Sequence, residues 1–246
     1  MPTAVAPDAI DVTFDDIVEA RRRIEGGVFV TPCVESPALS AITGSEVFCK
    51  LEYQQRTGSF KERGACNALM LLGAEERRRG VIAASAGNHA LALAYHGKRL
   101  GIPVTVVMPV HAPLVKQRRC RELGARVLNH GDNIAEARQR ADVLVAEERL
   151  TYINGFNDAA IVAGAGTIGL ELLEQVPDLD AAVVPIGGAG LIAGVSLAVK
   201  HLKPAVRIVG VEGTRCASWA AAVAAGHPVD RKSTRLNSSH EWISRM

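Results

Sequence analysis

A lysine stands where a predicted loop runs into a predicted helix, in the segment TGSFKERG that covers residues 57–64. The loop follows a predicted strand over residues 46–53. Lys61 therefore lies beyond the carboxyl end of a strand, which is where open α/β sheets bind ligands. An amine there can be partly desolvated and lose its proton readily, as Schiff-base formation with an aldehyde requires. Most lysines are solvated charges, so the interpretation of Lys61 as a Schiff-base lysine depends on the neighbouring motifs.

The segment SAGNH, residues 85–89, follows a short apolar strand and opens a predicted helix. Backbone N–H groups at a helix start bind anions, so this turn suits a substrate carboxylate. Asn88 offers both a donor and an acceptor to a polar ring atom. An ordinary serine-capped helix would have a similar sequence, and His89 alone indicates a packed helix residue better than a catalytic base.

A third turn, GGAGL at residues 187–191, joins an apolar strand to a helix. Glycines let successive N–H groups converge without obstruction by Cβ atoms, which favours a phosphate site. A plain tight turn would also explain these glycines, and the turn has neither the dinucleotide GxGxxG spacing nor a P-loop lysine. A lysine, a carboxylate site and a phosphate site together are what an aldehyde cofactor with a phosphate group needs.

The elements around these turns alternate between strands and helices, and several strands are apolar on both faces. This pattern predicts the α/β class, with parallel sheet covered on both sides. A capped amphipathic helix is predicted from Thr13 to Ile24. Further strands are predicted over residues 80–84, 103–108, 125–129, 181–186 and 206–211, and further helices over residues 61–79, 88–100, 114–123 and 134–148.

Bulk composition indicates the kind of protein and its surroundings. Hydrophobic residues at 48%, charged residues at 22% and a net charge of +2 are ordinary globular values, with no basic tract for nucleic acid. No apolar stretch could span a bilayer, and the N-terminus does not resemble a signal peptide. The five cysteines have no CxxC spacing, which indicates reduced thiols. We therefore expect a cytoplasmic protein with neither nucleic acid nor membrane as a partner.

The last segment, RKSTRLNSSHEWISRM at residues 231–246, has no periodic apolar face and no strand pattern. It stands where an alternating α/β architecture should continue. We predict that it is a non-native tail, such as a translated cloning linker. A native disordered tail is the alternative.

With these motifs the chain resembles threonine/serine dehydratases, of the pyridoxal-phosphate fold family that includes tryptophan synthase β chains and cysteine synthases. The resemblance runs from Phe14 to Glu212 and includes GTIGLE at residues 166–171. It implies two open parallel-sheet αβα sandwich domains, with the larger one incomplete. The larger domain would comprise residues 1–50 and 151–230, and the smaller one residues 51–150.

The resemblance also implies a role for each motif. Lys61 would hold pyridoxal 5'-phosphate as a Schiff base and later move the Cα proton of a small amino-acid substrate. Asn88 would bind the 3-hydroxyl of the cofactor and Phe60 would flank its ring. The phosphate would be bound by Gly187, Gly188, Ala189, Gly190 and Leu191, and the substrate carboxylate by Ser85, Ala86, Gly87 and His89. The implied reaction is ammonia-releasing β-elimination from threonine or serine, in a homo-oligomer.

Several residues depart from the family pattern. Ala189 replaces the third of four usual glycines, which would cost roughly 1 kcal/mol if φ is positive there. Ala165 replaces a frequent glutamine, and Leu91 and Ala92 replace a common Gln-Gly pair. Glu212 matches a cation ligand of some relatives but lacks its acidic partner, so no metal site is predicted.

Other functions remain open from the sequence. Serine racemase and β-replacement synthase share the fold, although racemases need a second proton donor where Ala86 stands. An inactive truncated fragment is the alternative from another class, because relatives continue further and supply the contact to the pyridine nitrogen there.

Overall fold

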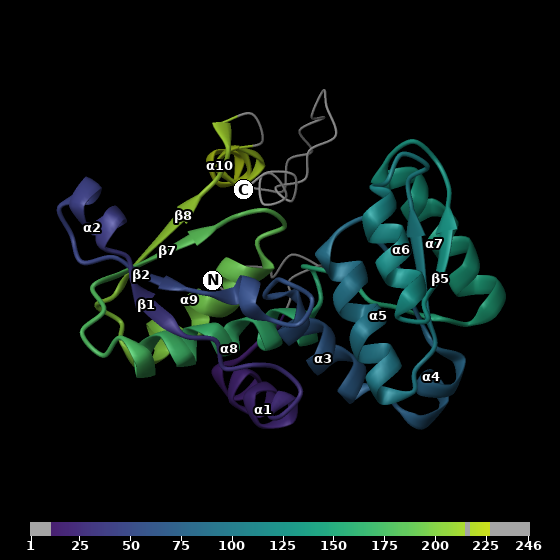
Figure 1. Ribbon diagram of the computed structural model, residues 1–246, viewed down its shortest axis with the longest axis horizontal. Helices are drawn as coiled ribbons and strands as arrows, with labels where there is room; N and C mark the ends of the chain where they lie inside the picture. Colours follow the sequence, from purple (N-terminus) through teal and green to yellow (C-terminus); the bar gives the residue numbers. More distant parts are fainter. Residues whose placement is uncertain (1–10, 215–216, 227–246) are drawn as a thin grey trace, which may run out of the picture.

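The computed structural model describes residues 11–214 and 217–226, so the predicted non-native tail over residues 231–246 lies outside the described part. In Figure 1 the elements form two groups, and helix α3 (Lys61–Leu71) lies between them. Within the described residues, no helix is both long and apolar enough to cross a bilayer.

One group is built on a four-stranded parallel sheet with the order β5-β4-β3-β6. Its two central strands, β3 and β4, are buried along almost their whole length, as expected for a sheet covered on both faces. The strands are β3 (Val81–Ala84), β4 (Val104–Met108), β5 (Arg126–Asn129) and β6 (Thr151–Tyr152). The helices of this group are α4 (Ala74–Arg79), α5 (Asn88–Leu100), α6 (Leu114–Glu122) and α7 (Ile134–Glu148).

The two faces of this sheet pack against different helices. On one face, Val81, Ala83 and Val106 join a cluster with apolar residues of α3, α5 and α6. On the other face, Ile82 and Val107 pack against α7. Alternate side chains of a strand point to opposite faces, so each central strand contributes to both clusters.

The other group contains a second parallel pair, β7 (Ala181–Pro185) with β8 (Arg207–Val211). Apolar residues of β7 pack against helices α8 (Ala159–Gln175) and α9 (Gly190–Leu202). Two parallel sheets with helices agree with the predicted α/β class. The remaining elements here are α1 (Phe14–Ile24), α2 (Pro37–Thr43), the 3₁₀ turn η1 (Glu52–Gln54) and α10 (Ser218–Ala225).

Two predicted elements need correction. The strand expected over residues 46–53 is only β2 (Phe48–Lys50), and it pairs antiparallel with β1 (Cys33–Glu35), which was not predicted. The helix expected over residues 61–79 is broken between α3 and α4. Gly73 is extended there and starts a new helix, with the Glu76 carboxylate accepting its N–H at 2.8 Å. The chain turns extended at Leu72 and Gly73, which ends α3, and the one-sided cap from Glu76 then starts α4.

A buried network of ion pairs fixes α3 against its neighbours. The Arg63 guanidinium is fully buried and donates to both oxygens of Glu171 on α8 at 2.6 and 2.8 Å. It also donates to both oxygens of Glu52 in η1, at 2.7 and 2.9 Å. Lys50 of β2 donates to Glu171 at 2.5 Å. Burial alone would lower the pKa of Arg63, but its bonds to the two carboxylates outweigh burial and raise that pKa.

Arg63→Met tests this network, because it leaves two buried carboxylates without their guanidinium. We expect the free energy of unfolding, measured by urea titration, to fall by about 3–5 kcal/mol. The matched control is Arg21→Met, which removes a solvent-exposed pair with Glu174 and should cost at most about 1 kcal/mol. Equal losses in the two variants would contradict the assigned role of the network.

Candidate active site

Lys61 is the first residue of α3, and its side chain is mostly buried. The preceding turn is held by Glu62, whose carboxylate accepts the N–H of Thr57. The Lys61 Nζ atom donates to the carbonyl oxygen of Gly155 at 2.5 Å and lies 5.1 Å from the centroid of the Phe60 ring. Burial lowers the pKa of Lys61 to about 8. Roughly a tenth of these amines is therefore neutral and nucleophilic at pH 7, far more than for a lysine with the ordinary pKa.

The turn at residues 85–89 leads from β3 into α5, as the sequence predicts. The N–H of Gly87 donates to the Ser85 hydroxyl at 3.3 Å. Asn88 and His89 are buried at the start of α5. The Nε2 atom of His89 lies 3.1 Å from the carbonyl oxygen of Ile153. The turn thus combines a hydroxyl with the positive end of a 13-residue helix, which suits a carboxylate.

The glycine-rich turn leads from β7 into α9. Gly187 and Gly188 are exposed, and their N–H groups have no hydrogen-bond acceptor among the described residues. The N–H of Ala189 also lacks one there. Ala189 has φ of 62°, so the positive φ considered from the sequence is present and falls on a residue with a Cβ atom. Unpaired N–H groups at a helix start are what a phosphate requires.

The segment over residues 153–157 brings these three turns together, and the sequence did not predict it. Gly155 accepts from Lys61 and packs so tightly on His89 that an added Cβ would lie 2.9 Å from its Cγ atom. Phe156 packs on the glycine-rich turn, where a Cβ added to Gly188 would lie 2.2 Å from the Phe156 ring. Asn154-Gly155 is a common turn dipeptide, which was the available signal. Only the tertiary structure reveals the contacts of this turn.

Other predicted residues serve partly as packing. Phe60 and Leu191 pack against the cluster between β7 and α9, so Leu191 can offer only its backbone to a ligand. Ala86 packs against the cluster around α5. Glu212 accepts the N–H groups of Trp219 and Ala220 at 2.9 Å each and so caps α10. In the described part of the chain, no group of three His, Cys, Asp or Glu residues could hold a metal ion.

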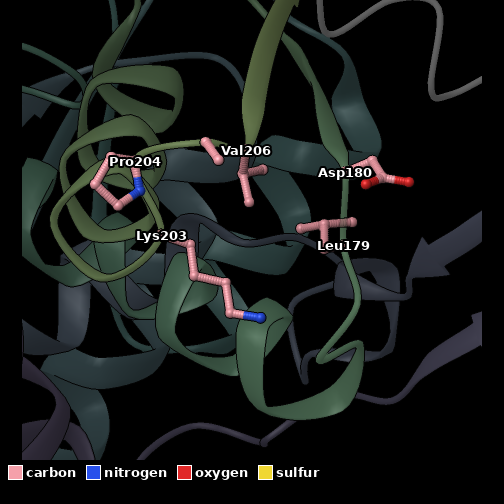
Figure 2. A pocket seen from close by; sticks show the side chains of 6 residues that line it. Leu179, Asp180, Lys203, Pro204 and Val206 are labelled. Carbon is pink, nitrogen blue, oxygen red and sulfur yellow. The ribbon is translucent and has the colours of Figure 1, made fainter.

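Figure 2 shows a separate hollow at the opposite end of the β7–β8 pair. Asp180 and Val206, which line it, precede the two strands, whereas the glycine-rich turn follows β7. Ligands of parallel sheets bind at the carboxyl ends of the strands. This hollow is therefore not part of the candidate site.

The sequence profile of the family described as "Pyridoxal-phosphate dependent enzyme" matches residues 24–244. The chain belongs to this family. The family is named after pyridoxal phosphate, which is the cofactor that the sequence predicts. The described residues fit that cofactor, because a desolvated amine, an adjacent aromatic ring and a turn with unpaired N–H groups are all present.

Relatives within the family agree with the predicted resemblance to dehydratases. The L-threonine ammonia-lyase of Thermotoga maritima is 45% identical over 215 residues, which are 87% of this chain and 54% of the relative. The catabolic L-threonine dehydratase of Escherichia coli K12 is 40% identical over 225 residues, which are 92% of this chain and 68% of the relative. The chain thus spans between about half and two thirds of the lengths of these relatives.

Solved structures confirm the fold. Maize serine racemase has a TM-score of 0.88 at 37% identity, over 91% of this chain and 68% of that one. Threonine deaminase isoform 2 of Solanum lycopersicum has a TM-score of 0.84 at 36% identity, over 93% of this chain and 66% of that one. These confirm the predicted tryptophan synthase β-like α/β fold. The residue roles and the domain boundaries remain predictions.

The depressed pKa of Lys61 predicts how its reaction with pyridoxal phosphate depends on pH. Only the neutral amine attacks the aldehyde, so the rate of covalent attachment should rise with pH and level off above about 8. Borohydride reduction followed by mass spectrometry of the Lys61 peptide measures that rate. The same peptide in the urea-unfolded chain is the control. Its rate should keep rising with pH until the pH approaches 10.5, the ordinary pKa of a lysine. Identical profiles in the two states would refute the desolvation of this amine.

The positive φ of Ala189 predicts that Ala189→Gly is stabilising. The left-handed conformation costs a residue with a Cβ atom roughly 1–2 kcal/mol, so the substitution should raise the free energy of unfolding by about 1 kcal/mol. The matched control is Ala193→Gly at an exposed position of α9, which should lower it by about 1 kcal/mol. Thermal melts of the two variants should shift in opposite directions, and a shared downward shift would rule out strain at Ala189.

Proposed function

We propose that this chain binds pyridoxal phosphate through Lys61 and, within the whole protein, releases ammonia from L-threonine or L-serine by β-elimination. One observation carries the proposal. The mostly buried amine of Lys61 has no carboxylate partner among the described residues and lies against Gly155, on the segment that contacts both anion-binding turns. Desolvation without a neutralising anion is what a Schiff-base lysine requires.

Each group has a proposed task. Lys61 would hold the cofactor through its amine, and the unpaired N–H groups of residues 187–189 would bind its phosphate. The turn over residues 85–89 holds the substrate carboxylate and fixes the direction of the Cα–H bond. The amine of Lys61 would take the Cα proton of the bound substrate. Bound cofactor supplies delocalisation of the resulting electron pair.

The net reaction balances without a further reactant. The Cα proton and the Cβ hydroxyl leave the substrate as water, and one water then enters as the amino group is released as ammonia. The product is a 2-oxo acid. Because threonine and serine differ by one methyl group, a pocket separates them by only about 1–3 kcal/mol, and the proposal includes both.

Racemisation on the same fold is the rival activity, and Ala86 argues against it. A racemase needs a second proton donor on the opposite face of the substrate, whereas Ala86 carries no ionisable group and packs against the core around α5. Chiral analysis of serine after incubation separates the two activities. A β-replacement synthase would instead require an added thiol or other nucleophile.

We also propose the finer features that the sequence predicts. The domain division into residues 1–50 with 151–230, and residues 51–150, is supported by the two parallel sheets, although β6 at Thr151–Tyr152 pairs with β3 just past the boundary. A cytoplasmic location is supported by four free thiols at Cys33, Cys49, Cys66 and Cys120. We propose a homo-oligomer that uses a small amino acid as substrate.

Lys61→Ala tests the proposed function with two separate measurements. The visible absorbance of protein-bound pyridoxal phosphate should disappear, and ammonia release from L-threonine should fall to background. Lys98→Ala, at an exposed position of α5, is the matched control and should retain both. Normal ammonia release by Lys61→Ala would refute the proposal. Cofactor binding without turnover in the unmodified chain would favour the inactive-fragment alternative.

A further inference from the structure

A second lysine reaches the predicted cofactor site from a different helix. Lys116 lies in the first turn of α6, and its Nζ atom donates to Oδ1 of Asn88 at 2.7 Å. The backbone N–H of Lys116 donates to the carbonyl oxygen of Pro113 at 3.0 Å, which fixes the start of the helix. The hydrogen bond therefore joins α6 to the beginning of α5, across the turn proposed to hold the substrate.

Lys116 has no acidic partner within residues 11–214 and 217–226. It forms no ion pair with any described residue, and Asn88 is the one described side chain to which its amine donates. Burial and then the neighbouring Arg119 lower the pKa of Lys116. A half-buried cation without a carboxylate is costly for the fold, and such arrangements concentrate at functional sites.

The chemistry of the pair determines how the Asn88 amide is oriented. An ammonium group donates only, so the amide must turn its oxygen toward Lys116. The amide NH₂ then points elsewhere, and it has no acceptor among the described residues. Asn88 itself is only 9% exposed, but its unpartnered Nδ2 atom is not fully buried, so the donor reaches open space and is available for a ligand.

We propose that Lys116 is a positioning residue that locks the Asn88 carboxamide with its NH₂ group toward the cofactor. The inference rests on the proposed function, in which Asn88 binds the ring oxygen of pyridoxal phosphate. With Lys116 in place, Asn88 donates to that oxygen and favours its anionic form. Without Lys116, the Asn88 amide can rotate and turn its own oxygen toward the ring oxygen of the cofactor, and two acceptors form no hydrogen bond.

Three substitutions of Lys116 test whether this position must donate a hydrogen bond to Asn88. Lys116→Met keeps the length but cannot donate, so the dissociation constant for pyridoxal phosphate should rise about tenfold, the loss of one hydrogen bond to a charged group. Lys116→Arg keeps the donor and should remain close to the unmodified chain. Lys116→Glu accepts only, so it should turn the NH₂ away from the cofactor and weaken binding more than Lys116→Met. Arg118→Met, exposed on the same helix, is the matched control and should change nothing.

The absorbance spectrum and a double-mutant cycle separate positioning from a general loss of structure. Lys116→Met and Lys116→Glu should shift the visible band of the bound cofactor toward the near ultraviolet, while Lys116→Arg should not. In an Asn88→Ala background, Lys116→Met should cause no further loss of affinity, because its effect acts through Asn88. Far-ultraviolet circular dichroism identifies any variant that is not folded, and the Arg and Glu substitutions then carry the comparison.

The outcomes keep this inference distinct from the proposed function. If the unmodified chain binds pyridoxal phosphate and all three Lys116 variants match it in affinity and spectrum, the positioning role is wrong and the proposed function stands. Equal losses from Lys116→Met with and without Asn88 would also overturn it, since Lys116 would then act independently. If the unmodified chain shows no cofactor absorbance and Lys61 is never modified, both fail together.

Discussion

The position of the Lys61 amine depends on how α3 is fixed against α8. The two helices cross with their backbones in contact, since a Cβ added to Gly164 would lie 2.7 Å from the carbonyl oxygen of Arg63. At this crossing the Arg63 guanidinium joins α8 and η1 through two carboxylates. Residues two apart on a helix face different directions, so Lys61 points away from this network and toward Gly155.

Helix α8 is connected to the site in two places. Its body holds α3 through Glu171, and its beginning follows the segment that contacts all three turns. Asp158 caps that beginning by accepting the N–H of Ala160 at 2.9 Å. A shift of α8 would move the carbonyl of Gly155, which accepts from Lys61. It would also move the ring of Phe156, which packs on the glycine-rich turn. The ion pairs and the site are therefore linked through contacts of the same helix.

Local patterns predicted much of this arrangement, and long-range contacts account for the rest. The limits of α5 and α7 agree with prediction, with Gly101 marking the end of α5 and the Asn133 cap marking the start of α7. Helix α8 escaped prediction because it is buried on nearly every side and shows no polar face. The role of Lys116 depends on a partner 28 residues away, which no local spacing reveals. The importance of residues 153–157 likewise comes from their tertiary contacts, which the sequence does not show.

Three lysines in the described part of the chain are at least partly buried, and their partners distinguish what each can do. Lys50 donates to the carboxylate of Glu171, so its partner is an anion and its role is structural. Lys116 donates to an amide, which neither neutralises it nor competes for its proton. Lys61 donates to a backbone carbonyl, and burial lowers its pKa, so among these three it combines strong desolvation with a position beside the segment that contacts the turns at residues 85–89 and 187–191. The partner atom, more than the residue type, therefore decides which amine can react with an aldehyde.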